Sequence, residues 1–170
     1  LETICANFGG ENIAACIVEP IAGSTGTLVP PKGYLQKLRQ ICDKHGILLI
    51  FDEVITGWGR TGSKFGAHEF GVTPDIMTMA KATTNGVVPM GVVACNDYIY
   101  DAVMDSSPMG SVELFHGYTY SGIPVAVAAA LAVQDIFEKE DIFNRAKNLA
   151  PYFQKGLFSL QDLESVDNIR

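Results

Sequence analysis

The first clear pattern in the chain is an apolar run, then an amphipathic segment, then a second apolar run. Residues 13–18 (IAACIV) have the length and composition of a strand buried on both faces, and they end at Glu19. Residues 33–45 place apolar side chains on one side of a helix and charged ones on the other, and Gly46 is expected to end that helix. Residues 47–51 (ILLIF) are the next expected strand. This order predicts a right-handed βαβ unit with parallel strands.

Two more short strands are expected further along, at residues 75–80 (DIMTMA) and 91–95 (GVVAC). The connection between them is too short for a crossover helix, so we expect this pair to be antiparallel. Together with the βαβ unit, they predict an α/β fold whose sheet is mostly parallel with one antiparallel strand.

Three further segments have helical patterns. Residues 1–8 (LETICANF) read as the tail of a helix, and residues 123–140 predict a helix that is apolar nearly all round and therefore interior. Asp141 is expected to cap a last helix through Leu157, which Pro151 should kink or break.

Composition excludes some classes of function. The 170 residues are 48% hydrophobic and 18% charged, as in folded globular domains, and their net charge is −7. This acidic balance argues against a nucleic-acid partner, because no basic stripe exists to replace counterions on phosphates. No apolar run reaches the length that spans a bilayer, so no membrane partner is expected. The absence of CxxC spacing predicts buried free thiols in a reducing, cytoplasmic environment for the four cysteines, Cys5, Cys16, Cys42 and Cys95.

Two side chains suggest chemistry. Asp52 directly follows the 47–51 strand, at the strand end where open α/β sheets bind ligands. It could bind a metal, cap a helix or hold a cationic ligand nitrogen, and either Asp52 or Glu53 could instead pair with Arg60. The histidines show no ligand spacing, so no metal site is expected. Lys81 follows the 75–80 strand, where burial would make an amine nucleophilic toward carbonyls. A buried lysine and a strand-end aspartate are the pair that pyridoxal phosphate requires, although a surface lysine is the commoner alternative.

Four motifs follow one another along the chain: VEPIAGSTG at 18–26, ILLIFDEVITGWGRTG at 47–62, GVTPDIMTMAKATTNGVVPMG at 71–91 and FHGYTYSG at 115–122. Together they resemble the class III aminotransferases, which use pyridoxal phosphate on the fold-type I scaffold. The resemblance runs from about Asn12 to the end, and it implies a large domain with helices on both faces of the sheet. It is closest to the ω-amino acid:pyruvate branch, which includes β-alanine–pyruvate transaminase.

The resemblance implies a role for five residues. Lys81 matches the lysine that forms the Schiff base with the cofactor and shuttles a proton, and Asp52 matches the aspartate bonded to the pyridinium nitrogen. Val54 matches the apolar residue on one face of the ring. Thr119 matches the threonine that reaches the cofactor phosphate of the neighbouring subunit, with Tyr118 beside it, which implies a homodimer with shared active sites. Ordinary core packing for Val54 and an ordinary loop hydroxyl for Thr119 are the structural alternatives.

The resemblance also implies that the chain is part of a longer enzyme. Residues 1–160 would belong to the cofactor-binding large domain without its N-terminal part, and residues 161–170 would begin the connection to a C-terminal small domain. The implied activity transfers an amino group from an ω-amino acid or amine to a keto acid, pyruvate. An aminomutase of the glutamate-1-semialdehyde type, a racemase on the same scaffold, and a non-catalytic piece remain open. Trp58 is expected to pack under its neighbours or line a substrate channel, and Glu19 to order the site or be structural.

Overall fold

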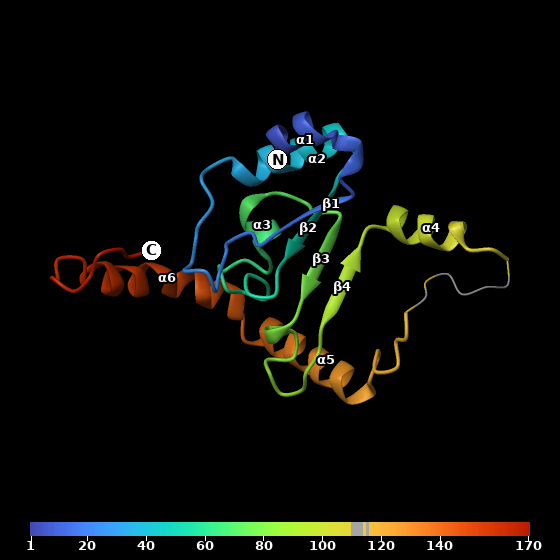
Figure 1. The fold of residues 1–170 in the computed structure, drawn as a ribbon. Coiled ribbons are helices and arrows are strands. Elements are labelled where there is room, and N and C mark those ends of the chain that lie inside the picture. The colour runs from blue at the N-terminus through green and yellow to red at the C-terminus, as the bar shows by residue number, and fades with distance from the viewer. Residues whose placement is uncertain (110–113, 115) are drawn as a thin grey trace.

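A four-stranded sheet forms the centre of the computed structural model, which describes residues 1–109, 114 and 116–170 (Figure 1). β1, β2 and β3 are parallel neighbours in that order, and β4 pairs antiparallel with β3. The predicted α/β class, with a mostly parallel sheet and one antiparallel strand, is confirmed. The strands are β1 (Ala15–Val18), β2 (Leu48–Asp52), β3 (Ile76–Met79) and β4 (Val92–Cys95).

The core lies between one face of this sheet and three helices. α2 (Tyr34–His45) connects β1 to β2 as predicted, and it ends at Gly46 in the left-handed conformation, with φ 69°. α1 (Glu2–Phe8) runs beside α2 in Figure 1, the short turn η1 (Gly10–Asn12) follows it, and α3 (Gly66–Phe70) follows β2. The buried side chains of this layer are Cys5, Leu35, Leu38, Ile41, Cys42, Ile47, Leu49, Phe51, Ala67 and Val72.

The other face of the sheet is open at several positions. Strand register places Ile17 beside Ile50, and side chains alternate between the two faces, so both point away from the buried Phe51. Ile17 is 63% exposed and Val93 of β4 is 70% exposed. The expectation that residues 13–18 are buried on both faces is therefore wrong, because only alternate side chains of β1 meet the helix layer. The helices α1, α2 and α3 pack on the opposite face, which carries the buried Phe51.

Asp75, just before β3, ties three elements together. Its carboxylate accepts hydrogen bonds from the Leu49 amide of β2 at 2.6 Å, from Arg39 of α2 at 2.8 Å and from the Tyr98 hydroxyl at 2.9 Å. Partial burial alone would raise the pKa of Asp75, but these donors outweigh it and lower that pKa. Tyr98 belongs to α4 (Asp97–Ser106), a helix that the apolar pattern did not predict.

α5 (Pro124–Lys139) is less buried than its sequence predicts. It packs against the turn η2 (Lys81–Thr83) and against α6 (Ile142–Phe158). Ala126 and Val133 are buried, but Leu131 is 64% exposed. The expectation of an interior helix is wrong, because one stripe of this helix meets the rest of the described chain while its other apolar side chains face solvent.

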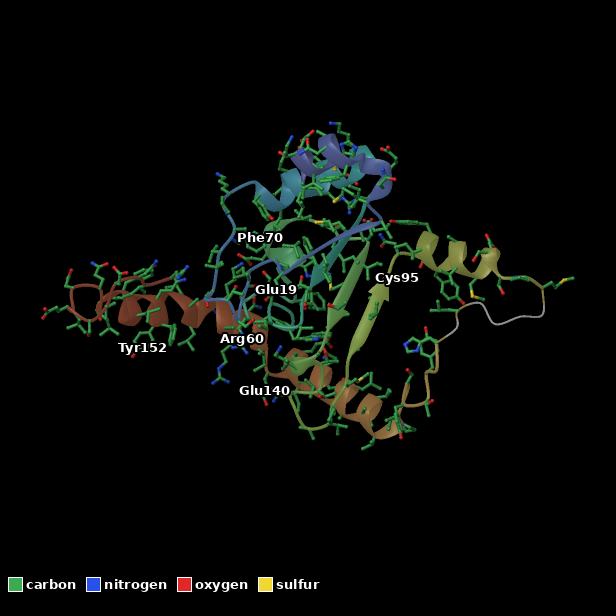
Figure 2. The ribbon with its side chains drawn as sticks, viewed as in Figure 1. Glu19, Arg60, Phe70, Cys95, Glu140 and Tyr152 are labelled. Atoms are coloured by element: carbon green, nitrogen blue, oxygen red, sulfur yellow. The ribbon has the colours of Figure 1, made fainter. Side chains whose placement is uncertain are left out.

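α6 extends away from the sheet, and its exposed Tyr152 lies far from the strands in Figure 2. Of the expected kink or break at Pro151, the break is wrong, because the helix continues through that residue. The proline removes a single backbone hydrogen bond, and in an exposed helix water can reach the freed carbonyl. Asp141 precedes α6 as predicted. However, its carboxylate accepts a hydrogen bond from the Asn144 side chain at 2.8 Å rather than from a backbone amide.

The cysteines are free thiols with different surroundings. Cys5 and Cys42 are buried, as expected, while Cys16 is half-buried and Cys95 is exposed at the end of β4. Burial raises the pKa of the Cys42 thiol to about 11, so it stays protonated and unreactive at neutral pH. Within the described ranges, none of the helices is both long and apolar enough to cross a membrane.

Candidate active site

The fold brings the two predicted catalytic groups to the same end of the sheet. Asp52 is the last residue of β2 and lies in register with Thr78 of β3, which precedes Lys81 by three positions. Because β2 and β3 are parallel, their carboxyl ends meet on one side, where α/β sheets bind ligands. The strand alternation turns Asp52 to the face opposite the buried Phe51. Its Oδ1 accepts a hydrogen bond from the Val54 amide at 3.0 Å, which fixes the carboxylate against the turn.

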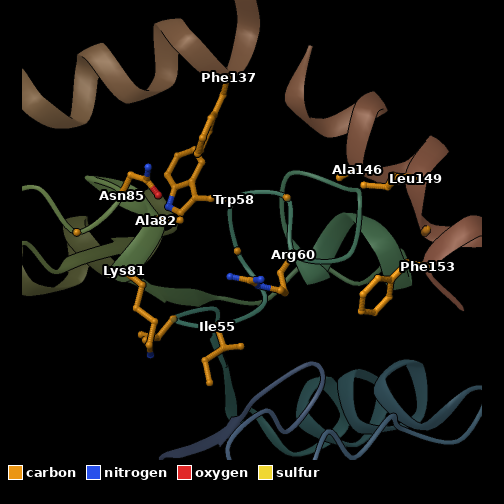
Figure 3. Close-up of a pocket in the computed structure, with 15 residues that line it drawn as sticks. Ile55, Trp58, Arg60, Lys81, Ala82, Asn85, Phe137, Ala146, Leu149 and Phe153 are labelled. Atoms are coloured by element: carbon orange, nitrogen blue, oxygen red, sulfur yellow. The ribbon is translucent and has the colours of Figure 1, made fainter. Parts of the chain in front are cut away.

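Lys81 and Val54 line a cavity of about 800 Å³ at this end of the molecule. Figure 3 shows contributions to it from the loop after β2, from η2 and from the two C-terminal helices, including Trp58, Arg60 and Phe153. Asp52 is half-buried and is not among the lining residues, although Val54 and Ile55 continue from it into the cavity wall.

Lys81 itself differs from the expectation of a buried amine. Its side chain is exposed, because the cavity that it lines is open to solvent, so the expected burial is wrong. Lys81 begins η2, and its backbone is in the left-handed region, with φ 43°. The chain changes direction here after β3. Among the described residues no carboxylate forms an ion pair with it, which leaves its amine available in the cavity.

Glu53 is a buried carboxylate whose role the sequence did not reveal. It is 0% exposed and accepts hydrogen bonds from the Gly66 amide at 2.8 Å, the Ala67 amide at 2.7 Å and the Thr56 hydroxyl. It therefore joins the turn after β2 to the start of α3. The suggested ion pair of Asp52 or Glu53 with Arg60 is wrong for the described residues, since Arg60 is exposed toward the cavity. The sequence did offer one signal for this role, since Glu53 stands in an otherwise largely apolar stretch. A carboxylate that is buried there must have hydrogen-bond donors around it.

Trp58 both packs and lines the cavity. Its ring lies 4.8 Å from that of Phe65, centroid to centroid, and 6.5 Å from that of Phe137 on α5. Its indole N–H donates to the Thr83 hydroxyl at 3.0 Å, a contact 25 residues apart in sequence that the apolar pattern could not indicate.

The remaining predicted residues lie outside this cavity. Thr119 and Tyr118 are exposed, and the Tyr118 ring stacks on His116 at 4.1 Å. Phe115 of the same motif lies outside the described residues. Glu19 accepts a hydrogen bond from the Gly23 amide at 2.9 Å, so it orders its own loop. The described part of the chain has no cluster of three or more side chains suited to binding a metal ion.

Comparison with known proteins places this geometry in context. A family model described as aminotransferase class-III matches residues 1–170. An omega-aminotransferase of Caulobacter vibrioides is 56% identical over 170 residues, covering 100% of the chain and 38% of that relative. A beta-alanine–pyruvate aminotransferase of Pseudomonas aeruginosa is 57% identical over 161 residues, covering 94% of the chain and 36% of that relative. The chain thus spans little more than a third of the length of these relatives.

Solved structures of transaminases share the fold of this chain. An (S)-enantioselective omega-transaminase from Thermomicrobium roseum superimposes with a TM-score of 0.93 at 42% identity, over 99% of this chain and 37% of that one. An amine transaminase from an uncultivated Pseudomonas species, in a PLP-bound form, superimposes with a TM-score of 0.88 at 45% identity, over 94% of this chain and 36% of that one.

Proposed function

Since the chain belongs to the class-III aminotransferase family, we propose that it supplies the lysine and aspartate of a pyridoxal phosphate site. The proposed reaction moves an amino group from an ω-amino acid or amine, such as β-alanine, to pyruvate. The observation that carries this proposal is the placement of Asp52 and Lys81 at the carboxyl ends of adjacent parallel strands, with Lys81 at an open cavity.

The residues present fit the cofactor chemically. The cavity of about 800 Å³ offers one amine without an ion pair among the described residues and an apolar wall that includes Val54 and Ile55. A carboxylate, Asp52, stands at the end of the neighbouring strand. When bound, pyridoxal phosphate supplies an aldehyde carbon that bonds to amines and a pyridine ring that accepts electrons.

Each residue then has a defined task. The Nζ of Lys81 would hold the aldehyde carbon and later carry a proton to and from the substrate carbon. The carboxylate of Asp52 would accept a hydrogen bond from the ring nitrogen and so keep the proton there, while the Val54 amide at 3.0 Å orients that carboxylate. The side chain of Val54 would pack on one face of the ring.

Assembly and context follow from the same proposal. Thr119 and Tyr118 are exposed and lie outside the cavity of their own chain. In a homodimer, Thr119 would contact the phosphate of the cofactor that the second subunit binds, with Tyr118 beside it. Residues 1–160 would belong to the large domain and residues 161–170 would lead to the small domain. We expect a cytoplasmic enzyme with small-molecule partners, an amino donor and a keto acid acceptor.

Cofactor capture tests the proposal directly. The protein is incubated with pyridoxal phosphate, reduced with borohydride, digested and mapped by mass spectrometry. We expect the pyridoxyl group on the peptide that contains Lys81, its loss in Lys81→Ala, and its retention in the control Lys32→Ala, which removes an exposed lysine. Equal labelling of the Lys81→Ala variant and the parent protein contradicts the proposal.

A second measurement separates the alternative functions. Incubation of the full-length protein with β-alanine and pyruvate should give alanine, and less of it in Asp52→Asn. In the full-length protein, labelling of Lys81 without alanine from any donor and pyruvate favours an aminomutase or racemase, and no labelling at all favours a non-catalytic role.

A further inference from the structure

The backbone at Lys81 adopts a conformation that residues with a side chain seldom take. Its φ is 43°, and the preceding Ala80 has φ −157° and ψ −145°. In the left-handed region the Cβ atom crowds the following carbonyl, so such a residue persists only where neighbouring contacts hold it. On the C-terminal side, the Gly86 amide donates to the Lys81 carbonyl at 3.3 Å.

On the N-terminal side, a chain of two hydrogen bonds reaches the peptide that joins Ala80 to Lys81. The indole N–H of Trp58 donates to the Thr83 hydroxyl at 3.0 Å, and that hydroxyl donates to the Ala80 carbonyl at 2.9 Å. The Thr83 amide donates to the same carbonyl at 2.9 Å. Thr83 is only 3% exposed, so water does not compete for these bonds.

Trp58 is itself held in place. Its φ of 59° is also left-handed, and its amide donates to the Lys64 carbonyl at 2.6 Å. Its ring packs on Phe65 and is approached by Phe137, which points toward it from α5 in Figure 3. The position of the Ala80 carbonyl is therefore linked to the loop after β2 and to α5.

We propose that Trp58 and Thr83 are positioning residues for Lys81, which hold its strained backbone so that its amine faces the cavity. This inference rests on the proposed function, because it gives Lys81 the bond to the cofactor aldehyde. In that bond-forming step the amine nitrogen attacks the aldehyde carbon, a C=N bond replaces C=O, and the oxygen leaves as water with the two amine protons. Without the hydrogen-bond chain, residue 81 relaxes toward the right-handed region and its amine meets the aldehyde less often.

The rate of aldehyde capture tests this role. Absorbance follows the reaction of the protein with pyridoxal phosphate, and borohydride reduction with peptide mapping confirms that the product is on Lys81. Thr83→Val removes the hydroxyl at similar volume, and Trp58→Phe removes the indole N–H but keeps an aromatic ring. We expect each to slow capture roughly five- to tenfold, the effect of losing about one buried hydrogen bond. Thr83→Ser, which keeps the hydroxyl, should restore the parent rate, and the exposed control Thr73→Val should leave it unchanged.

Fluorescence and circular dichroism together separate the loss of the indole hydrogen bond from a general loss of folded structure. Trp58 is the single tryptophan of the chain, so its emission in Thr83→Val reports the loss of the indole hydrogen bond while far-UV circular dichroism checks the fold. If Thr83→Val does not fold, Trp58→Phe and Thr83→Ser decide. The inference is overturned if Trp58→Phe and Thr83→Val react with pyridoxal phosphate at the rate of the parent protein. It is also overturned if Thr83→Ser folds but reacts slowly. Equal capture by the parent and Lys81→Ala overturns the proposed function instead.

Discussion

Replacing the buried carboxylate of Glu53 by an amide should destabilise the protein without changing the size of the side chain. Glu53 is 0% exposed, and its two oxygens serve the amides of Gly66 and Ala67 and the hydroxyl of Thr56. In Glu53→Gln one oxygen becomes an NH₂ group. The Thr56 hydroxyl can rotate to accept from it, but a backbone amide cannot.

The size of the effect follows from counting donors. In either orientation of the glutamine amide, one of the two backbone N–H groups faces another donor and loses its acceptor. An unpaired buried donor costs about 1–3 kcal/mol, so we expect Glu53→Gln to lower the free energy of unfolding by about 2 kcal/mol. Glu53→Ala removes the acceptor for three donors and leaves a void, so its loss should be larger, at about 3–6 kcal/mol. Either is a large fraction of the ~5–15 kcal/mol typical of a folded domain.

Urea unfolding at neutral pH, followed by far-UV circular dichroism, measures these differences. The matched control is Glu164→Gln, which makes the same chemical change at an exposed position and should stay within about 0.5 kcal/mol of the parent. Hydrogen exchange locates the effect, because the amides of Gly66 and Ala67 should exchange faster in Glu53→Gln. A free energy of unfolding equal to that of the control, with unchanged exchange at these two amides, refutes the reasoning.

Two further predictions concern stability. The pKa of Asp75 is lowered in the folded protein, so its contribution to stability is present above the ordinary value of 3.8 and is lost as the pH falls through the folded pKa. Asp75→Asn should therefore be less stable than the parent at pH 7, and the gap between their urea midpoints should narrow at acid pH; a gap independent of pH speaks against this. Gly46→Ala should cost about 1 kcal/mol, because φ is 69° while a Cβ there meets nothing within 4 Å. Gly66→Ala should cost more, since its Cβ would lie 2.7 Å from the Cβ of Pro20, and thermal unfolding of the two variants should rank them in that order.

Local sequence signals predicted the elements near the site. The apolar runs and the amphipathic segment gave β1, α2, β2 and the antiparallel pair, because period and length report local structure directly. Asp52 and Lys81 follow two of these runs, so their approach at one end of the sheet follows from parallel strand order. The helix α4, which begins at Asp97 and Tyr98, was not predicted. The acidic Asp97 in its first turn is a known signal for the start of a helix.

Burial and long-range hydrogen bonds could not be predicted in the same way. Leu131 is apolar, yet it is 64% exposed, because burial depends on what packs against a helix rather than on the helix alone. Lys81 is exposed for a similar reason, since its cavity is open. The Gly66 and Ala67 amides that donate to Glu53 lie 13 and 14 residues away in sequence, and the Thr83 hydroxyl that accepts from the Trp58 indole lies 25 residues away, so only the folded chain brings these groups together.

The sheet order has a consequence for how this chain behaves among copies of itself. β1 and β4 are the outermost of the described strands, so each presents an edge of backbone N–H and C=O groups that no other described strand pairs with. Free edges are templates for strand addition from another molecule. Beside these edges the exposed Ile17 and Val93 add apolar side chains to the same surface. Concentrated preparations are therefore expected to join edge to edge unless additional strands occupy these two borders.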